Sequence, residues 1–281
     1  MEHYRTWLFS PADAPDRCLK ALNSDADQVI WDLEDGVGAG NKASAQLNLI
    51  KLLKQIPRTR TPWIRINGLD DISAITAVIP HPRWVVPKVE QTFLTQLQDL
   101  TTPPHAKQEW LFIIESARGL WDLLHSPIPW QRGADAIRLA FGSLDYLNDI
   151  GGRSTREETE LVGARTALPW ISRAWNWPAP IDSVYPVIDD ITTLAALTRR
   201  SQAFGFAGRM IIHPRQIAPV NQSFLPSEEE RQWAQAILGG ASSHRGVVRI
   251  NGEMVDKPVV ERARRISDLA AQYTALKQPQ K

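Results

Sequence analysis

The chain has 281 residues, of which 43% are hydrophobic and 22% are charged, and its net charge is +1. This composition is ordinary for a globular protein, and the length allows one large domain or two modest ones. The balance of 32 basic against 31 acidic residues gives no electrostatic reason to expect nucleic-acid binding. No apolar run is long enough to cross a membrane.

Cys18 is the single cysteine, so the chain cannot form an internal disulfide or a Cys-rich zinc site. The first residues, Met1 to Arg5, lack the apolar segment of a signal peptide. We therefore expect a soluble, cytoplasmic protein with no membrane partner.

Eight short apolar segments predict strands. They are 5–10, 27–33, 63–67, 84–87, 110–114, 136–141, 180–185 and 208–212. Apolar residues at helical spacing, or polar and acidic helix starts, predict helices between them. These lie at 16–22, 42–55, from Asp70 onward, 91–100, 117–124, 157–175 and 189–203.

This regular alternation of strands and helices indicates parallel strands and an α/β fold. Eight such units within residues 1–222 predict a TIM (β/α)₈ barrel, which typically takes about 250 residues. An open, doubly wound sheet is the competing architecture. It usually has a Gly-rich first turn for a nucleotide, whereas the first turn here reads Ser10-Pro11-Ala12-Asp13.

The pattern changes after residue 222. A helix is predicted at 226–238, then a polar linker at 239–245, a short strand at 247–252 and a last helix at 259–275. These elements cannot add a ninth barrel unit. We therefore expect residues 223–281 to form a C-terminal helical arm or lid that contacts a neighbouring subunit.

Charged and polar residues follow most of the predicted strands. In chain order they are Glu34, Asp35, Arg65, Lys88, Glu115, Asp145, Tyr185 and His213. Barrel active sites lie on the face formed by the C-terminal strand ends. The coincidence of so many such groups on one face predicts an active site there.

Glu115 and Asp145 are the predicted metal ligands. Two carboxylates, completed by waters and a substrate oxygen, suit Mg²⁺, and no His or Cys pair has the spacing of a zinc site. The alternative is that each carboxylate pairs with a nearby arginine, such as Arg118 or Arg138, because structural ion pairs also place charges at strand ends.

Arg65 lies within an apolar segment, where it could bind a substrate carboxylate or carbonyl through paired hydrogen bonds. Its alternative role is an ion pair with Glu34 inside the barrel. Glu34 and Asp35 could orient metal-bound water or simply charge a helix start. Lys88 could be a Schiff-base lysine, but a stabilising charge or a salt bridge to Glu90 is favoured.

Several short motifs occur in the order found in the citrate lyase beta-subunit-like branch of the HpcH/HpaI aldolase family, and the chain resembles that branch from Arg5 to about Pro258. The motifs are Arg5-Thr6-Trp7-Leu8-Phe9, Asp32-Leu33-Glu34-Asp35, Arg65-Ile66-Asn67, Pro87-Lys88-Val89-Glu90, Ile114-Glu115-Ser116-Ala117-Arg118-Gly119, Phe141-Gly142-Ser143-Leu144-Asp145, Ile181-Asp182-Ser183-Val184-Tyr185, Gly205-Phe206-Ala207-Gly208-Arg209 and Ile212-His213-Pro214-Arg215-Gln216.

The resemblance implies a TIM barrel, Mg²⁺ on Glu115 and Asp145, and a substrate-binding Arg65. It also implies an acyl-CoA substrate and a homotrimer. The segment Gly252-Glu253-Met254-Val255-Asp256-Lys257-Pro258 matches the family's C-terminal arm, which implies that Asp256 is a general acid/base acting in the next subunit's site. Two departures are Pro11-Ala12, where Pro-Gly is common, and Arg209, where Lys is usual.

The predicted reaction is Mg²⁺-dependent cleavage of a C–C bond in a short β-hydroxyacyl-CoA, giving acetyl-CoA and a keto acid. Citramalyl-CoA is the first candidate, and citryl-CoA and malyl-CoA are close behind it. Arg65, Asp256, Glu34 and Asp35 are the predicted catalytic residues, and the predicted substrate-binding residues are Arg65, Lys88, Ser143 and Tyr185.

Two other functions remain open at this point. One is a metal-dependent aldolase that acts on free hydroxy-keto acids without CoA. The other is a non-catalytic subunit of an acyl-carrier lyase complex.

Overall fold

The computed structural model describes residues 4–57, 60–101, 108–125, 136–241, 248–250 and 253–276. The chain divides into two compact units, Met1–Val220 and Asn221–Lys281. Among the described residues, no helix is both long enough and apolar enough to span a membrane.

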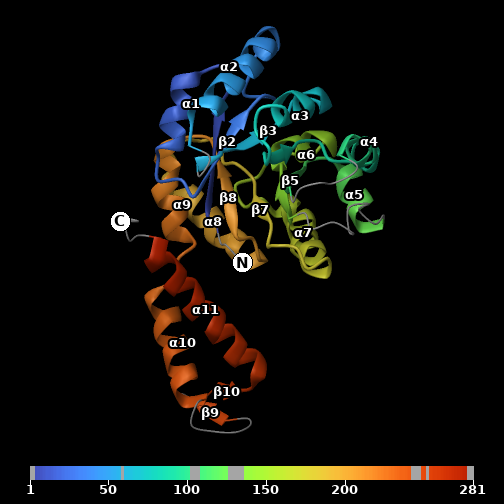
Figure 1. Cartoon of the computed structure of the whole chain (residues 1–281). Coiled ribbons are helices and arrows are strands. Elements are labelled where there is room, and N and C mark those ends of the chain that lie inside the picture. Colours follow the sequence, from blue (N-terminus) through green and yellow to red (C-terminus); the bar gives the residue numbers. More distant parts are fainter. Residues whose placement is uncertain are drawn as a thin grey trace. The chain divides into compact units, whose positions relative to one another are not determined.

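The first unit is a closed barrel of eight parallel strands whose spatial order follows their order in the chain (Figure 1). The strands are β1 Thr6–Pro11, β2 Gln28–Asp32, β3 Trp63–Arg65, β4 Arg83–Val86, β5 Glu109–Ile114, β6 Ala136–Phe141, β7 Ile181–Asp182 and β8 Gly208–Ile211. The predicted TIM barrel is therefore confirmed, and the open sheet is wrong because β8 pairs with β1.

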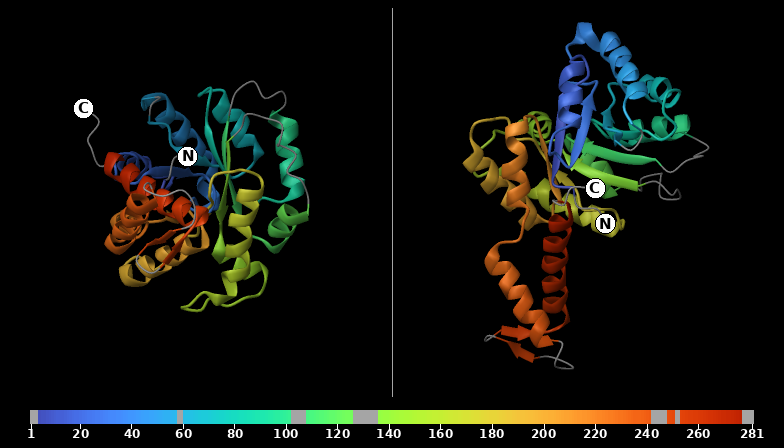
Figure 2. Two further views of the ribbon diagram at one scale, coloured as in Figure 1. Left: turned by 90° about the horizontal axis from the view of Figure 1, so that it is seen from below. Right: turned by 60° about the vertical axis from the view of Figure 1, so that its left-hand side comes forward.

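Helices surround the strands, as the views in Figures 1 and 2 show. They are α1 Pro15–Leu22, α2 Lys42–Gln55, α3 Leu69–Thr76, α4 Gln91–Thr101, α5 Ala117–His125, α6 Ser143–Asp149, α7 Val162–Ala174, α8 Ile191–Phe204 and α9 Ile217–Ser223. The helix predicted at 157–175 begins late, at Val162, after a single 3-10 turn at Thr159–Leu161. Glu158 has a left-handed backbone, with φ of 46°, which a right-handed helix cannot accommodate.

The interior of the barrel is filled by apolar side chains from every strand. Its buried cluster consists of Trp7, Ile30, Trp63, Val85, Leu111, Ile113, Ala140, Ile181 and Met210. Full burial of each large side chain contributes roughly 1.5–3 kcal/mol. Because strands buried on both faces need apolar residues throughout, this core accounts for the continuous apolar runs in the sequence.

Strand β7 is only two residues long, although the sequence predicted a strand over 180–185. The strand ends at Asp182, and the Ser183 backbone N–H donates to the Asp182 carboxylate at 2.8 Å instead of continuing the ladder. Tyr185 therefore lies in the loop between β7 and α8.

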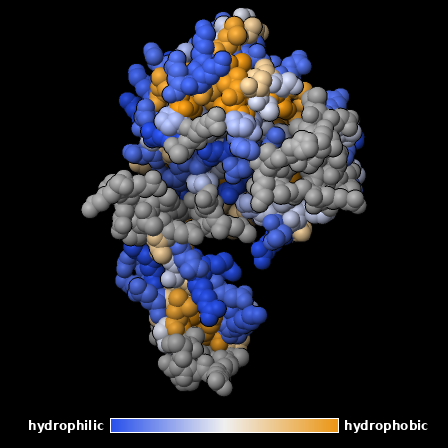
Figure 3. Space-filling model, viewed as in Figure 1, coloured by the Kyte–Doolittle hydropathy of each residue, from blue (hydrophilic) through white to orange (hydrophobic). Residues whose placement is uncertain are grey.

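The second unit is a pair of long helices with a small hairpin at one end, visible in Figures 1 and 2. The helices are α10 Glu228–Ala241 and α11 Lys257–Leu276, and the antiparallel strands are β9 Val248–Ile250 and β10 Glu253–Val255. Apolar residues including Ile237, Val255 and Ala263 form its own core. In Figure 3 part of its surface is apolar, and Met254 is 66% exposed.

Two predictions for this unit were wrong in detail. The linker predicted at 239–245 begins later because α10 continues to Ala241, and β10 was not predicted. The rest of that linker, and residues 247, 251 and 252 of the predicted strand and motif, lie outside the described residues.

A buried ionic cluster surrounds Asp182, the last residue of β7. Asp182 accepts hydrogen bonds from Arg209 at 2.8 Å and Arg165 at 3.2 Å, and also from Ser201. Burial by itself would raise the pKa of Asp182, but the Arg209 and Arg165 guanidiniums lower the pKa below its ordinary value. The Asp182 carboxylate therefore stays ionised and offsets the charge of two buried arginines.

We predict that Asp182→Ala lowers the free energy of unfolding by about 3–5 kcal/mol, because the substitution leaves the buried Arg209 guanidinium without its carboxylate, whereas Arg165 keeps Glu158. Urea unfolding followed by circular dichroism measures this change. The matched control is Asp189→Ala, which removes an exposed ion pair with Arg215 and should have little effect. Equal destabilisation by the two variants would contradict the assigned role of the buried cluster.

Candidate active site

Glu115 follows the last residue of β5 and lies buried at the C-terminal rim of the barrel, with 5% of its surface exposed. Its Oε1 accepts a hydrogen bond of 2.6 Å from the backbone N–H of Lys88. Gly142 packs directly against the carboxylate, and a Cβ added there would lie 2.6 Å from Oε2. The glycine after β6 is therefore required for the close approach of the two strand ends.

The pKa of Glu115 is raised to about 8. Burial is the largest cause, and the negative charges of Glu34 and Asp145 raise the pKa further, whereas the Lys88 hydrogen bond and the Arg65 charge lower it. Burial and the neighbouring carboxylates together therefore disfavour the ionised form of Glu115.

Asp145 lies in the first turn of α6, four residues beyond the end of β6. Its side chain is exposed, and its charge acts on Glu115. The alternative partner Arg118 pairs instead with Asp122 at 2.8 Å. Asp145 is therefore near enough to Glu115 for its charge to raise the pKa of that carboxyl group, and its role as a metal ligand stays a prediction.

Arg65, the last residue of β3, is held by two carboxylates. Its Nε and Nη2 each donate to Asp32 at 2.6 Å, and its Nη1 lies 2.9 Å from Glu34 Oε2. Burial by itself would lower the pKa of Arg65, but hydrogen bonding and charge from Asp32 and the charge of Glu34 raise it above its ordinary value. The guanidinium therefore remains a cation in a fixed orientation. The ion pair with Glu34, the alternative role considered for Arg65, is present, but Asp32 is its main partner.

Lys88 links Glu34 to Glu115. Its Nζ donates to Glu34 Oε1 at 2.6 Å while its backbone N–H binds Glu115. The backbone is left-handed, with φ of 50°, a conformation that costs energy in a residue other than glycine. The predicted salt bridge to Glu90 is wrong, because Glu90 accepts a hydrogen bond from Ser116 instead.

The loop after β2 carries Glu34 and Asp35 in different environments. Glu34 is buried and faces Arg65 and Lys88, whereas Asp35 is exposed and acts on both cations through its charge. Lys42 fixes this loop by donating from Nζ to the backbone carbonyls of Leu33 and Glu34.

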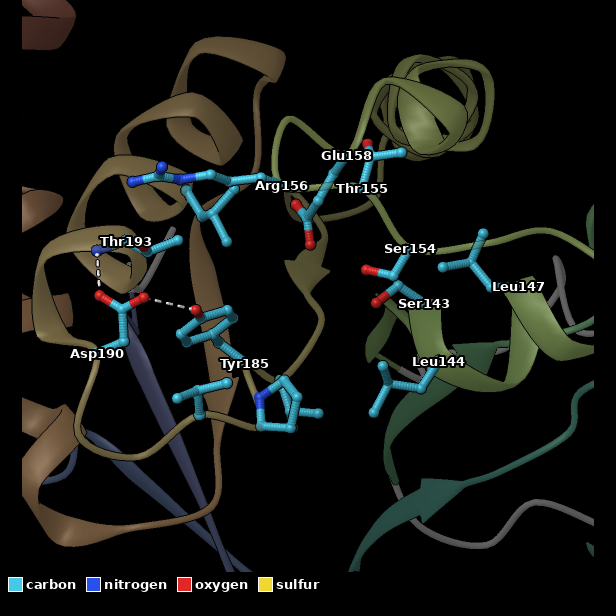
Figure 4. A pocket seen from close by; sticks show the side chains of 14 residues that line it. Ser143, Leu144, Leu147, Ser154, Thr155, Arg156, Glu158, Tyr185, Asp190 and Thr193 are labelled. Atoms are coloured by element: carbon cyan, nitrogen blue, oxygen red, sulfur yellow. Dashed lines mark hydrogen bonds between the residues drawn. The ribbon is translucent and has the colours of Figure 1, made fainter.

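A pocket of about 340 Å³ lies beside α6 (Figure 4). Ser143 lines one wall and is hydrogen-bonded through its hydroxyl to Ser183 at 2.7 Å. Tyr185 lines the opposite wall and donates to Asp190 at 2.9 Å. Ser143 directly follows Gly142, which packs against Glu115, and the volume of the pocket is at the lower end of the range for small-molecule pockets.

His213 and Asp256 each cap a helical segment. His213 accepts a hydrogen bond from the Arg215 backbone N–H and so caps the 3-10 turn that follows β8. Asp256 belongs to the second unit, where its carboxylate caps α11 by accepting from the Val259 backbone N–H at 3.3 Å. Asp256 therefore has a helix-capping role within its own unit.

Asp32 was present in a quoted motif but received no predicted role. It ends β2, is 2% exposed, and binds Arg65 as well as the backbone N–H groups of Glu34 and Gly36. A signal did exist in the sequence, because Asp32 and Arg65 lie in consecutive predicted strands, 27–33 and 63–67, and neighbouring parallel strands bring such residues close together.

Comparisons with known proteins relate this chain to one family. The sequence model of the HpcH/HpaI aldolase/citrate lyase family matches residues 5–214, and that of the C-C bond lyases of the TIM-barrel fold matches residues 179–275. The citrate lyase subunit beta of Leuconostoc mesenteroides subsp. cremoris is 31% identical, with 95% of this chain and 93% of the relative aligned. The mitochondrial citramalyl-CoA lyase of Homo sapiens is 28% identical, with 95% and 85% aligned.

A solved structure agrees with the sequence comparisons. The protein CitE from Mycobacterium tuberculosis, in complex with magnesium, acetoacetate and coenzyme A, superposes with a TM-score of 0.79 at 27% identity, covering 96% of this chain and 98% of that protein. Because the match extends over the barrel and the residues beyond it, and because the family model covers most of the chain, this protein belongs to the HpcH/HpaI aldolase/citrate lyase family and is a carbon–carbon lyase of the citrate lyase beta type.

Proposed function

We propose that this lyase cleaves a short β-hydroxyacyl-CoA to acetyl-CoA and a keto acid, with Mg²⁺ held by Glu115 and Asp145. Citramalyl-CoA, which would give pyruvate, is the first candidate substrate, and citryl-CoA and malyl-CoA follow it. The names of the human and Leuconostoc relatives support this substrate class. The magnesium and coenzyme A in the M. tuberculosis homologue support the choice of cofactor and of thioester.

The observation that carries the proposal is that Glu115 is a buried carboxyl group beside other carboxylates and, among the described residues, forms no ion pair. Burial and the charges of Glu34 and Asp145 raise its pKa to about 8. Glu34 Oε2 is fully buried and accepts no hydrogen bond from the described residues, although the Arg65 guanidinium lies beside it. A hard divalent cation would relieve both conditions, so these residues fit Mg²⁺.

The number of ligands also fits. Among the described residues, no three His, Cys, Asp or Glu side chains are grouped closely enough to form a metal cage. Mg²⁺ commonly takes only one or two carboxylates and keeps several waters or substrate oxygens. When bound, it supplies Lewis-acid polarisation of the substrate oxygens.

The protein's own groups account for the remaining chemistry. A carboxylate, either Asp256 or one of the loop residues Glu34 and Asp35, removes the proton from the substrate hydroxyl. The C–C bond then breaks, the hydroxyl carbon becomes the carbonyl of the keto acid, and the electron pair passes to the acetyl-CoA enolate, which is later protonated. The fixed cation of Arg65 offsets the negative charge that develops.

Substrate contacts follow from the surroundings of the site. Lys88 is 61% exposed in its side chain, so its ammonium can approach an anionic substrate. Ser143 and Tyr185 line the pocket next to Glu115, and this pocket accommodates the acyl part of the substrate.

The second unit supplies the last group. In a homotrimer, the C-terminal arm of one subunit carries Asp256 to the barrel of its neighbour. Apolar surface on this unit, including Met254, supports such a contact.

The assay that tests the function incubates the protein with citramalyl-, citryl- and malyl-CoA, with Mg²⁺ or with EDTA. We predict release of a keto acid that stops with EDTA and returns with excess Mg²⁺. Release unaffected by EDTA would contradict the metal proposal. Activity on free hydroxy-keto acids, with no turnover of any thioester, would favour the aldolase instead.

We predict that Mg²⁺ affinity depends on pH. Below about pH 8 the Glu115 carboxyl is mostly protonated, so binding must displace its proton. The association constant should rise about tenfold for each pH unit from 6 to 8 and level off above that. Titration calorimetry in buffers of different ionisation enthalpy measures both the affinity and the released proton. An affinity that is constant from pH 6 to 9 would refute this prediction.

We predict that Asp256→Ala and Arg65→Lys are each strongly impaired but complement each other. If Asp256 acts in the neighbouring barrel, a trimer co-expressed from both variants contains some sites with both residues intact, roughly a quarter for random assembly. Mixed trimers should therefore recover measurable turnover. The control is each variant purified alone, and no recovery in mixtures shown by mass analysis to be heteromeric would exclude action between subunits.

A further inference from the structure

We infer that Asp32 is a positioning residue for the lyase reaction, and that it acts by fixing the orientation of the Arg65 guanidinium. This inference rests on the proposed function, in which Arg65 faces the substrate. Asp32 and Arg65 are partners in the parallel ladder of β2 and β3, and each is the last residue of its strand. The pair therefore lies at the rim of the barrel, beside the loop that carries Glu34.

The Asp32 carboxylate has no remaining capacity for substrate or metal. Oδ1 accepts from Arg65 Nε at 2.6 Å and from the Glu34 backbone N–H at 2.8 Å. Oδ2 accepts from Arg65 Nη2 at 2.6 Å and from the Gly36 backbone N–H at 2.8 Å. A carboxylate has about four lone-pair sites, so all of them are occupied, and Asp32 acts only through its partners.

The bidentate contact determines which part of Arg65 remains available. A guanidinium has five N–H groups, and Asp32 takes the one on Nε and one on Nη2. The remaining N–H groups all belong to the Nη1 and Nη2 end, next to Glu34. Two parallel hydrogen bonds also fix the plane of the group, so Asp32 directs this end of Arg65 toward the site.

Gly36 makes the arrangement possible. A Cβ at this position would overlap Asp32 Oδ2, whereas a Cβ at Gly38, two residues further along the same loop, would meet nothing within 4 Å. Neither glycine has a positive φ, so alanine is acceptable to both backbones. The two sites offer a matched pair of substitutions, one that displaces the Asp32 carboxylate and one that does not.

The first test is Asp32→Asn, which keeps the shape of the side chain but introduces an NH₂ group against the donors of Arg65. We expect kcat for the best thioester substrate to fall roughly 10- to 100-fold, because a small misplacement of a catalytic group has effects of this size. KM should change less than about threefold, and circular dichroism and thermal unfolding should show a folded protein.

A double-mutant cycle separates positioning from a merely structural role. In an Arg65→Lys background the guanidinium group that Asp32 orients is absent. Adding Asp32→Asn to that background should therefore lower kcat by less than about a further twofold. If Asp32 only supports the fold, its effect on kcat per folded protein will be the same in both backgrounds. That additive outcome would overturn the inference.

The second test compares Gly36→Ala with Gly38→Ala. Gly36→Ala should reproduce the fall in kcat seen with Asp32→Asn, and Gly38→Ala should leave kcat unchanged. Crystal structures of the Asp32→Asn and Gly36→Ala variants should show a rotated Arg65 guanidinium. An unmoved guanidinium, or equal effects of the two glycine variants, would refute the positioning role. If the unaltered protein turns over no thioester, the proposed function fails first and takes this inference with it.

Discussion

Three carboxylates, those of Asp32, Glu34 and Glu115, lie buried within one rim of the barrel. Buried charges of one sign repel each other strongly unless cations or hydrogen-bond donors offset them. Arg65 binds Asp32 and contacts Glu34, and Lys88 binds Glu34. Glu115 receives a backbone N–H instead of a cation, and the unequal distribution of positive charge therefore defines the chemistry of the site.

The barrel satisfies this constraint with backbone groups as well as side chains. N–H groups of Glu34, Gly36 and Lys88 are directed at carboxylates, and such donors do not titrate and move little. The left-handed backbone at Lys88 and the bare Cα at Gly142 both serve Glu115. Strained or tightly packed backbone positions thus lie next to the buried carboxylates, and such positions are common at functional sites.

Asp182, at the end of β7, has the opposite arrangement. Two buried arginines and a serine surround this carboxylate, and the net effect is a lowered pKa. Asp182 is electrostatically satisfied, so it stabilises the fold and needs no further ligand. Glu115, with a pKa raised to about 8, forms no ion pair among the described residues and is the carboxyl group for which we propose a cation. The same side-chain chemistry therefore serves structure at one strand end and supports function at another.

The sequence by itself determined the barrel. Each strand is a short apolar run, and most helices have apolar residues at helical spacing. These patterns are local, so they can be recognised without knowing which distant residues come into contact. It also indicated that Glu34, Arg65, Lys88 and Glu115 would share one face, because parallel strands end on the same side.

Only the tertiary structure decided how those residues pair. Arg65 binds Asp32, 33 positions away, and Lys88 binds Glu34, 54 positions away, instead of the nearby Glu90. Such pairings depend on strand register and side-chain rotamers, which no local pattern encodes. The shortness of β7 and the late start of α7 were missed for a related reason. A hydrogen bond from the Ser183 backbone to the Asp182 side chain accompanies the end of β7, and the left-handed backbone at Glu158 delays the start of α7.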